Sequence, residues 1–125
     1  MESRLDCDVV IVNFNAGRLL LDCVASVFAA GADICIVVDN ASTDGSIEDL
    51  QQAFVREDLV LVRNTRNAGF ASACNTGVSR SSASHLLFLN PDCTLTEGSL
   101  SRMLDVLESE NDIGMVGGFL SNPDG

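Results

Sequence analysis

The sequence predicts an α/β fold with an open, doubly wound and mostly parallel sheet. Short apolar runs rich in β-branched residues alternate along the chain with longer segments whose apolar residues recur at helical spacing. Strands that are apolar along their whole length are typical of parallel sheets covered by helices on both faces. Right-handed crossovers between such strands then give a doubly wound sheet.

The first strand and the first helix are predicted from the residues before position 32. Residues 7–12 are a continuous apolar run, which is typical of a buried strand. Asn15 can cap the helix that follows, in which apolar residues recur from 19 to 28. Gly31 ends that helix, because glycine readily adopts the backbone conformation of a helix stop.

The same alternation continues through the middle of the chain. Residues 34–38 are the second predicted strand, and a polar turn at 40–45 leads into a helix with apolar residues between 47 and 54. Residues 59–62 are the third strand.

The second half of the chain begins with a polar loop at 64–69 and a short helix at 70–78. Residues 86–89 are the fourth predicted strand, and apolar residues at helical spacing predict a helix at 100–107. A fifth strand is predicted at 113–116.

Composition limits the class of protein. The 125 residues suit one domain, and a hydrophobic fraction of 46% is enough for a core. With 7 basic and 18 acidic residues the formal net charge is −11, which disfavours nucleic acids and anionic membranes as partners. No run approaches the ~20 apolar residues of a transmembrane helix, and the N-terminal apolar run is too short and too acidic for a signal peptide.

Five cysteines form no C-x-x-C pair, and their number is odd. Cys7, Cys23 and Cys35 lie in apolar runs, where cysteine behaves as a small hydrophobic residue. We therefore expect reduced cysteines and a cytoplasmic location, which includes the inner face of the membrane.

Polar residues follow each of the first four predicted strands. Ligands of open parallel sheets bind outside the carboxyl ends of the strands, so these residues are expected along one edge. They are Asn13 and Asn15; Asp39 and Asn40; Arg63, Arg66, Asn67 and Gly69; and Asn90 and Asp92. Carboxylates, amides and arginines on one edge suit a ligand with a base, a sugar and a diphosphate.

Four motifs occur in order: VIVNFN at 10–15, VVDNASTDGS at 37–46, NAGFA at 67–71 and FLNPD at 88–92. Continued by IGMVGG at 113–118, they closely resemble family 2 glycosyltransferases, which have the Rossmann-like GT-A fold, and especially the rhamnosyltransferase-like branch. The resemblance implies a metal-dependent, inverting transferase of polysaccharide biosynthesis. Its donor would be a dTDP- or UDP-sugar, with dTDP-rhamnose one option, and its acceptor a hydroxyl of a glycan or a lipid-linked sugar.

By this resemblance Asp39 is the residue that reads the base of the donor. Its carboxylate would accept the ring N–H of uracil or thymine, which cytosine does not offer. The alternative is that Asp39 only caps the turn at 42–45, because aspartate is a good turn residue.

Asp92 matches the last acidic residue of the family's D-x-D motif, and it would hold Mg²⁺ or Mn²⁺. Such a cation neutralises the charge that develops on a departing diphosphate. Asn90 departs from the motif and would bind the donor only through hydrogen bonds. The alternative is a plain Asn-Pro-Asp turn.

The other donor-binding residues implied by the resemblance follow the first and third strands. Gly69 would let the backbone approach the nucleotide closely, beside Asn67. Arg66 would bind the base or the diphosphate, or else lie in solvent. Asn75 would face either the donor or solvent, and the remaining two residues of the set are Asn13 and Asn15.

The resemblance also implies that residues 1–125 are the N-terminal, nucleotide-sugar-binding half of a truncated domain. In inverting members the catalytic base and the acceptor pocket come from later residues. Glu97 and Asp124 match no base motif, so the base is unassigned. Without the later residues, we expect an uncovered sheet surface near 113–116 that promotes self-association.

Three other classes of function bear comparison with the sequence. A nucleotide-sugar-binding module without turnover of its own fits the missing half. A receiver-like signalling domain is disfavoured, because no acidic cluster follows the first strand and the chain has no lysine. A dinucleotide-binding domain is disfavoured because no G-x-G-x-x-G follows that strand.

Overall fold

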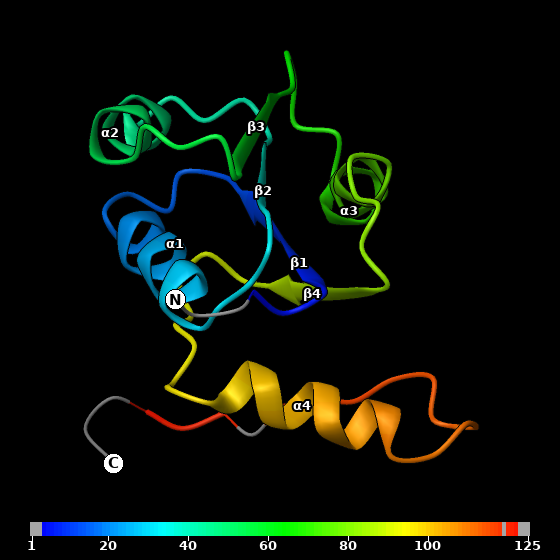
Figure 1. The fold of residues 1–125 in the computed structure, drawn as a ribbon. Coiled ribbons are helices and arrows are strands. Elements are labelled where there is room, and N and C mark those ends of the chain that lie inside the picture. The colour runs from blue at the N-terminus through cyan, green and yellow to red at the C-terminus, as the bar shows by residue number, and fades with distance from the viewer. Residues whose placement is uncertain (1–3, 119, 123–125) are drawn as a thin grey trace.

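The computed structural model of the protein describes residues 4–118 and 120–122 (Figure 1). Its strands are parallel and lie in the order β3-β2-β1-β4. The predicted α/β fold, an open and doubly wound parallel sheet, is confirmed. The elements in chain order are β1 (Cys7–Asn13), α1 (Leu19–Ala29), β2 (Cys35–Asp39), α2 (Ser46–Ala53), β3 (Leu59–Arg63), α3 (Phe70–Val78), β4 (His85–Leu89) and α4 (Ser99–Glu108).

The two faces of the sheet bury different residues of the same strands. In β1, Val9 and Ile11 pack with α1, α2 and two leucines of α4, whereas Val10 faces Ala73 of α3. Figure 1 shows α1 and α2 on one side of the sheet and α3 on the other. Burial on both faces is the reason why β1 and β2 are apolar along nearly their whole length.

Helix α3 lies very close to β1. A Cβ atom added at Gly77 would lie 2.4 Å from Cγ1 of Val10, so only glycine fits there without a shift. This close contact holds the helix against the sheet, and Gly69 at its N-terminus lies at the carboxyl edge.

The prediction that Asn15 caps the first helix is wrong. Helix α1 begins at Leu19, with Arg18 at its N-cap. Asn15 instead has a φ of 52°, and its Oδ1 accepts a hydrogen bond from the backbone N–H of Thr43. The side chain that could have capped the helix joins two loops.

The predicted fifth strand is also wrong. Residues 113–116 form no strand, and Met115 is 90% exposed. An apolar run becomes a strand only where a neighbouring strand pairs with it, and none pairs here among the residues that the structure describes. Asp124 lies outside the described residues.

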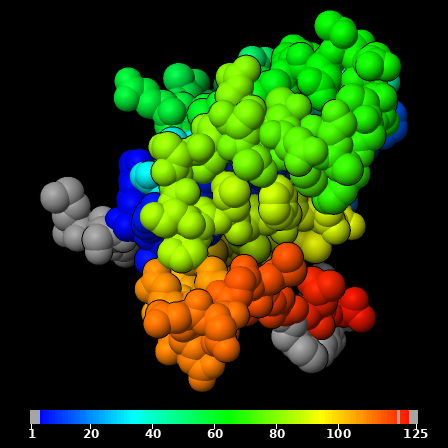
Figure 2. Space-filling view, turned by 90° about the vertical axis from the view of Figure 1, so that its right-hand side faces the viewer, coloured from blue at the N-terminus to red at the C-terminus, as the bar shows by residue number. Residues whose placement is uncertain are grey.

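Strand β4 has an uncovered side. Leu86 and Phe88 face the same side of the sheet as α3, and they are 36% and 48% exposed. Figure 2 looks onto this side and shows the segment around β4 at the surface between α3 and α4. The uncovered sheet surface expected near 113–116 therefore occurs on β4 instead.

The cysteines and the helix lengths agree with the sequence analysis. All five cysteines are free thiols, and Cys7, Cys23 and Cys35 are buried. Burial raises the pKa of the Cys7 thiol to about 11. Within residues 4–118 and 120–122, no helix is long and apolar enough to cross a membrane.

Candidate functional site

The carboxyl ends of three neighbouring strands place their last residues in one row. Asn13 of β1 is the register partner of Asp39 of β2, which is in turn the partner of Arg63 of β3. These three polar residues were expected along one edge of the sheet, and the register places them there.

Asp39 is the buried centre of this row, with 1% of its surface exposed. Its Oδ1 accepts hydrogen bonds from Asn13 Nδ2 at 2.9 Å and from the Ser42 hydroxyl at 2.6 Å. Its Oδ2 accepts the backbone N–H of Ser42 at 3.0 Å. A carboxylate offers about four acceptor positions, so Asp39 caps the turn and retains one position on Oδ2.

Asn13 connects β1 to this turn and to the start of α2. Its side chain is fully buried, and Nδ2 lies 3.1 Å from the Ser42 hydroxyl and 3.0 Å from the Ser46 hydroxyl. Its buried Oδ1 has no hydrogen-bond partner among the described residues. The amide orientation is set by Asp39, because the carbonyl oxygen would be repelled by the carboxylate.

The loop after β1 is bound to the loop after β2. The backbone N–H of Asn15 donates to the Ser42 hydroxyl at 2.9 Å. Asp44 accepts the N–H of Gly17 at 2.9 Å and the N–H of Ser46 at 3.0 Å. Hydrogen bonds from Ser46 and, to a smaller extent, from Gly17 lower the pKa of the Asp44 carboxyl. Asp44 thus binds the first residue of α2 as well as the loop after β1.

Asn40 binds the loop after β3, a role that the sequence analysis missed. Its side chain is 2% exposed, and its Oδ1 accepts Asn64 Nδ2 at 2.9 Å and the Ala68 N–H at 3.4 Å. Its Nδ2 donates to the carbonyl oxygen of Gly69 at 3.2 Å. The signal in the sequence was an amide at the strand end, but it was interpreted only as one of the polar residues of the edge and as the first residue of the turn at 40–45.

The loop itself presents its polar side chains to solvent. Arg66 and Asn67 are exposed, and Asn67 Oδ1 accepts the N–H of Gly69 at 2.9 Å. Gly69 has a φ of +87°, which favours glycine. Arg63 is paired with Glu48 at 3.2 Å, whereas Arg66 has no ion pair within the described part of the chain.

The remaining predicted residues lie apart from the buried network. Asn90 and Asp92 are exposed in the loop after β4. Asn75 is exposed on α3, about half a turn from the buried Ala73 and Gly77, so it points away from the sheet. The structure brings Asn13, Asn15 and Asp39 together, and it does not bring Asn75 to them.

A divalent cation would find one open carboxylate at this edge. No group of three or more histidine, cysteine or acidic residues in the described ranges could hold a metal ion. Asp92 is exposed, and its Oδ1 accepts a hydrogen bond from the Cys93 thiol at 3.7 Å. One hard oxygen ligand fits Mg²⁺ or Mn²⁺, which keep waters and phosphate oxygens in their coordination shell.

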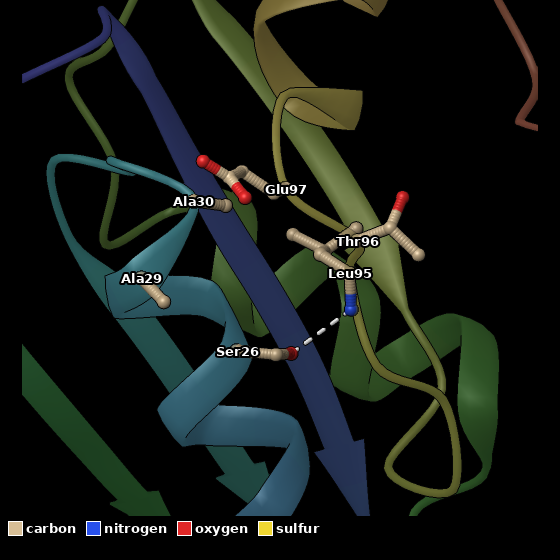
Figure 3. A pocket seen from close by; sticks show the side chains of 6 residues that line it. All are labelled: Ser26, Ala29, Ala30, Leu95, Thr96 and Glu97. Carbon is tan, nitrogen blue, oxygen red and sulfur yellow. Dashed lines mark hydrogen bonds between the residues drawn. The ribbon is translucent and has the colours of Figure 1, made fainter.

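A shallow groove elsewhere on the molecule is not part of this site. It has a volume of about 220 Å³ and lies beside the C-terminal half of α1, where the Leu95 N–H donates to the Ser26 hydroxyl (Figure 3). Glu97 lines this groove. Because α1 begins at the carboxyl edge and runs away from it, Glu97 lies away from the buried network.

Asp44 makes the connection between the loop after β1 and the loop after β2 dependent on pH. The pKa of the Asp44 carboxyl is lowered in the folded state. Its contribution to the free energy of unfolding is therefore complete above the ordinary pKa of 3.8 and is lost as the pH falls toward the lowered pKa. We expect Asp44→Asn to lower the free energy of unfolding at pH 7, and we expect this difference to shrink below pH 4, measured by urea titration.

Asp112→Asn, in an exposed turn after α4, controls for the loss of one negative charge. A deficit of Asp44→Asn that is equally large at pH 7 and in acid would contradict the role of the ionised carboxylate.

Comparisons with known proteins give the family of the chain and relatives of its fold. Residues 8–125 match the family Glycosyl transferase family 2. No curated protein matches the chain significantly. Among solved structures, a mannosyltransferase of Pyrobaculum calidifontis in complex with GDP-Man and Mn²⁺ is similar, with a TM-score of 0.75, 21% identity, and coverage of 84% of this chain and 33% of that one.

The TarS protein of S. aureus is also similar in structure. Its residues 1–349 match with a TM-score of 0.73, 15% identity, and coverage of 84% of this chain and 33% of that one. The same protein in complex with UDP-GlcNAc matches with a TM-score of 0.73, 15% identity, and coverage of 84% and 32%. The chain therefore spans about a third of the length of these structures, which share its fold. Since the family match covers nearly all of its residues, this chain belongs to glycosyl transferase family 2.

Proposed function

We propose that residues 1–125 are the donor-binding part of a glycosyltransferase domain and bind a nucleotide-diphospho-sugar at the carboxyl edge of the sheet. The observation that carries this proposal is the row of strand-end residues, together with the hydrogen bonds that connect the loops after β1, β2 and β3 to one another. Structures of the same fold were solved with GDP-Man and with UDP-GlcNAc. Because those structures are longer than this chain, we place the acceptor part of the domain outside residues 1–125.

The base of the donor would lie beside Asp39. The acceptor position that remains on Oδ2 suits a ring N–H of uracil or thymine. Phe14, next to Asn13, is 51% exposed, and its ring offers a face on which the base can stack. Asn13 and Asn15 would hold this end of the site in position.

The ribose and the diphosphate would extend from there along the loop after β3. Arg66 supplies the positive charge of this loop, and Asn67 and Gly69 supply an amide and a close approach of the backbone. Asn90 would bind a hydroxyl or a phosphate oxygen from the other side, and Asn75 is an outer contact at most.

Asp92 would hold the divalent cation, Mg²⁺ or Mn²⁺. The cation supplies neutralisation of the charge on the departing diphosphate. A chain with a net charge of −11 needs this help, because its own field repels a diphosphate.

The reaction proposed is an inverting transfer. A hydroxyl of a glycan or a lipid-linked sugar would attack the anomeric carbon, and the nucleoside diphosphate would leave from the opposite side. We assign the base to no residue of this chain. We place the protein in polysaccharide biosynthesis, in the rhamnosyltransferase-like branch with a dTDP- or UDP-sugar as donor. The free thiols favour the cytoplasm, including the inner face of the membrane.

A nucleotide-sugar-binding module without turnover is the second candidate. The observation that favours it is the engagement of Asp39 and Asp44, whose carboxylates already accept hydrogen bonds from the chain. Neither carboxylate is therefore placed to take a proton from an acceptor hydroxyl.

Nucleotide titrations test the proposed function and the role of the cation. We expect the protein to bind UDP or dTDP in calorimetry, and we expect Mn²⁺ to tighten binding by about tenfold or more. Asp92→Ala should remove the effect of Mn²⁺. Asp105→Ala, an exposed carboxylate on α4, should keep it.

Equal stimulation by Mn²⁺ in wild type and Asp92→Ala would assign the cation to another group, and absence of binding to UDP, dTDP and GDP would remove the proposed function. We expect no sugar transfer to glycan acceptors by these residues alone. Robust transfer would place the catalytic base within them.

The role of Asp39 is tested by a pair of variants. Asp39→Asn places an N–H₂ group next to the hydrogen-bond donors of Asn13 and Ser42. We therefore expect the free energy of unfolding to fall by about 1–3 kcal/mol. We also expect UDP binding to weaken by about 1–3 kcal/mol, because the ring N–H loses its acceptor.

Ser42→Ala is the matched control, because it loosens the same turn and keeps the carboxylate. It should lower stability and largely retain UDP binding. Equal losses of UDP binding in both variants would mean that Asp39 only stabilises the turn and does not contact the base.

The uncovered side of β4 would support self-association. We expect light scattering to show concentration-dependent oligomers, and we expect Phe88→Asp to reduce them because a charge opposes burial of this surface. Val55→Asp, at a residue that is 91% exposed and follows α2, is the control and should not reduce them. A monodisperse monomer at all concentrations would contradict this proposal.

A further inference from the structure

Asn40 stands out because its whole side-chain amide is directed at one loop. Its Oδ1 and Nδ2 make three hydrogen bonds, all to residues between 64 and 69, and its side chain is nearly inaccessible to solvent. Its own backbone is fixed as well, because its N–H donates to the carbonyl oxygen of Asn13 at 2.9 Å. Asn40 thus holds loop 64–69 in a fixed position relative to the ends of the strands.

The loop is held mainly at its two ends. At its beginning, the N–H of Asn64 donates to the carbonyl oxygen of Asp39 at 2.8 Å. At its end, the carbonyl oxygen of Gly69 accepts both Asn40 Nδ2 and the N–H of Ala73, which is the first hydrogen bond of α3. Between these anchors lies the exposed Arg66, whose own side chain has no partner in the described residues.

We propose that Asn40 is a positioning residue that fixes loop 64–69 and thereby aims Arg66 at the diphosphate of the donor. This inference rests on the proposed function. A loop arginine binds a phosphate well only if the loop is ordered beforehand, since otherwise binding must supply the cost of ordering it. Removing the side-chain amide of Asn40 does not change Arg66 itself, but it removes the hydrogen bonds that hold the backbone of loop 64–69.

A double-mutant cycle tests the coupling. In calorimetry with UDP and Mn²⁺, Asn40→Ala and Arg66→Ala should each weaken binding by about tenfold. The double variant should be weakened by much less than the product of the two single losses, because the effect of Asn40 passes mainly through the position of the arginine. UMP, which lacks the second phosphate, should lose much less affinity than UDP in each variant.

Loop order is measured separately by trypsin without any ligand. Cleavage after Arg66, identified by mass spectrometry, should be about tenfold faster in Asn40→Ala than in wild type. Ser42→Ala controls for general destabilisation, because it loosens the adjacent turn and touches no residue of loop 64–69. Arg80→Ala, beyond the C-terminus of α3, controls for the loss of one positive charge in the calorimetry.

The outcomes separate the two proposals. Additive losses in the double variant, or equal losses for UMP and UDP, would overturn the positioning role, and so would unchanged cleavage after Arg66 in Asn40→Ala. Failure of the wild type to bind UDP, dTDP or GDP would instead overturn the proposed function and the donor role of the loop with it.

Discussion

The carboxyl edge of this sheet depends on one buried carboxylate, that of Asp39. Removing an ionised group from water is costly unless hydrogen bonds compensate for it, and Asn13 and Ser42 supply them. These donors are anchored in turn, Asn13 to the start of α2 and Ser42 to the loop after β1. The geometry of two loops therefore follows from satisfying one carboxylate.

Two successive residues at the end of β2, Asp39 and Asn40, bind loops that lead to opposite faces of the sheet. Asp39 holds the loops that lead to α1 and α2 on one face, whereas Asn40 holds the loop that leads to α3 on the other. This division follows from the strand, whose neighbouring side chains point to opposite faces. Segments far apart in the sequence are thereby ordered before any ligand arrives, which lowers the cost of binding.

The charge of the chain shapes the chemistry that this edge can perform. Many of its polar groups are neutral amides. Arg63 pairs with Glu48 and Asp44 accepts two backbone N–H groups, whereas Arg66 on one loop and Asp92 on another are exposed charges without such partners in the described residues. In the proposed function, amides and one arginine orient the nucleotide, and a cation offsets the repulsion between the departing diphosphate and a protein with a net charge of −11. Preorganised loops and an added cation thus complement each other.

The sequence by itself determined the α/β class and the four described strands, because strands covered on both faces must be apolar along most of their length. It also determined that the residues after these strands meet at one edge, since parallel strands end on the same side. Only the tertiary structure decided the partners: Asn40 binds groups 24, 28 and 29 residues away, and Asn15 joins a loop instead of capping α1. It also decided that the apolar run at 113–116 is not a strand. Hydrogen bonds and strand pairing between distant segments depend on where the folded chain places their partners, and local pattern does not record that placement.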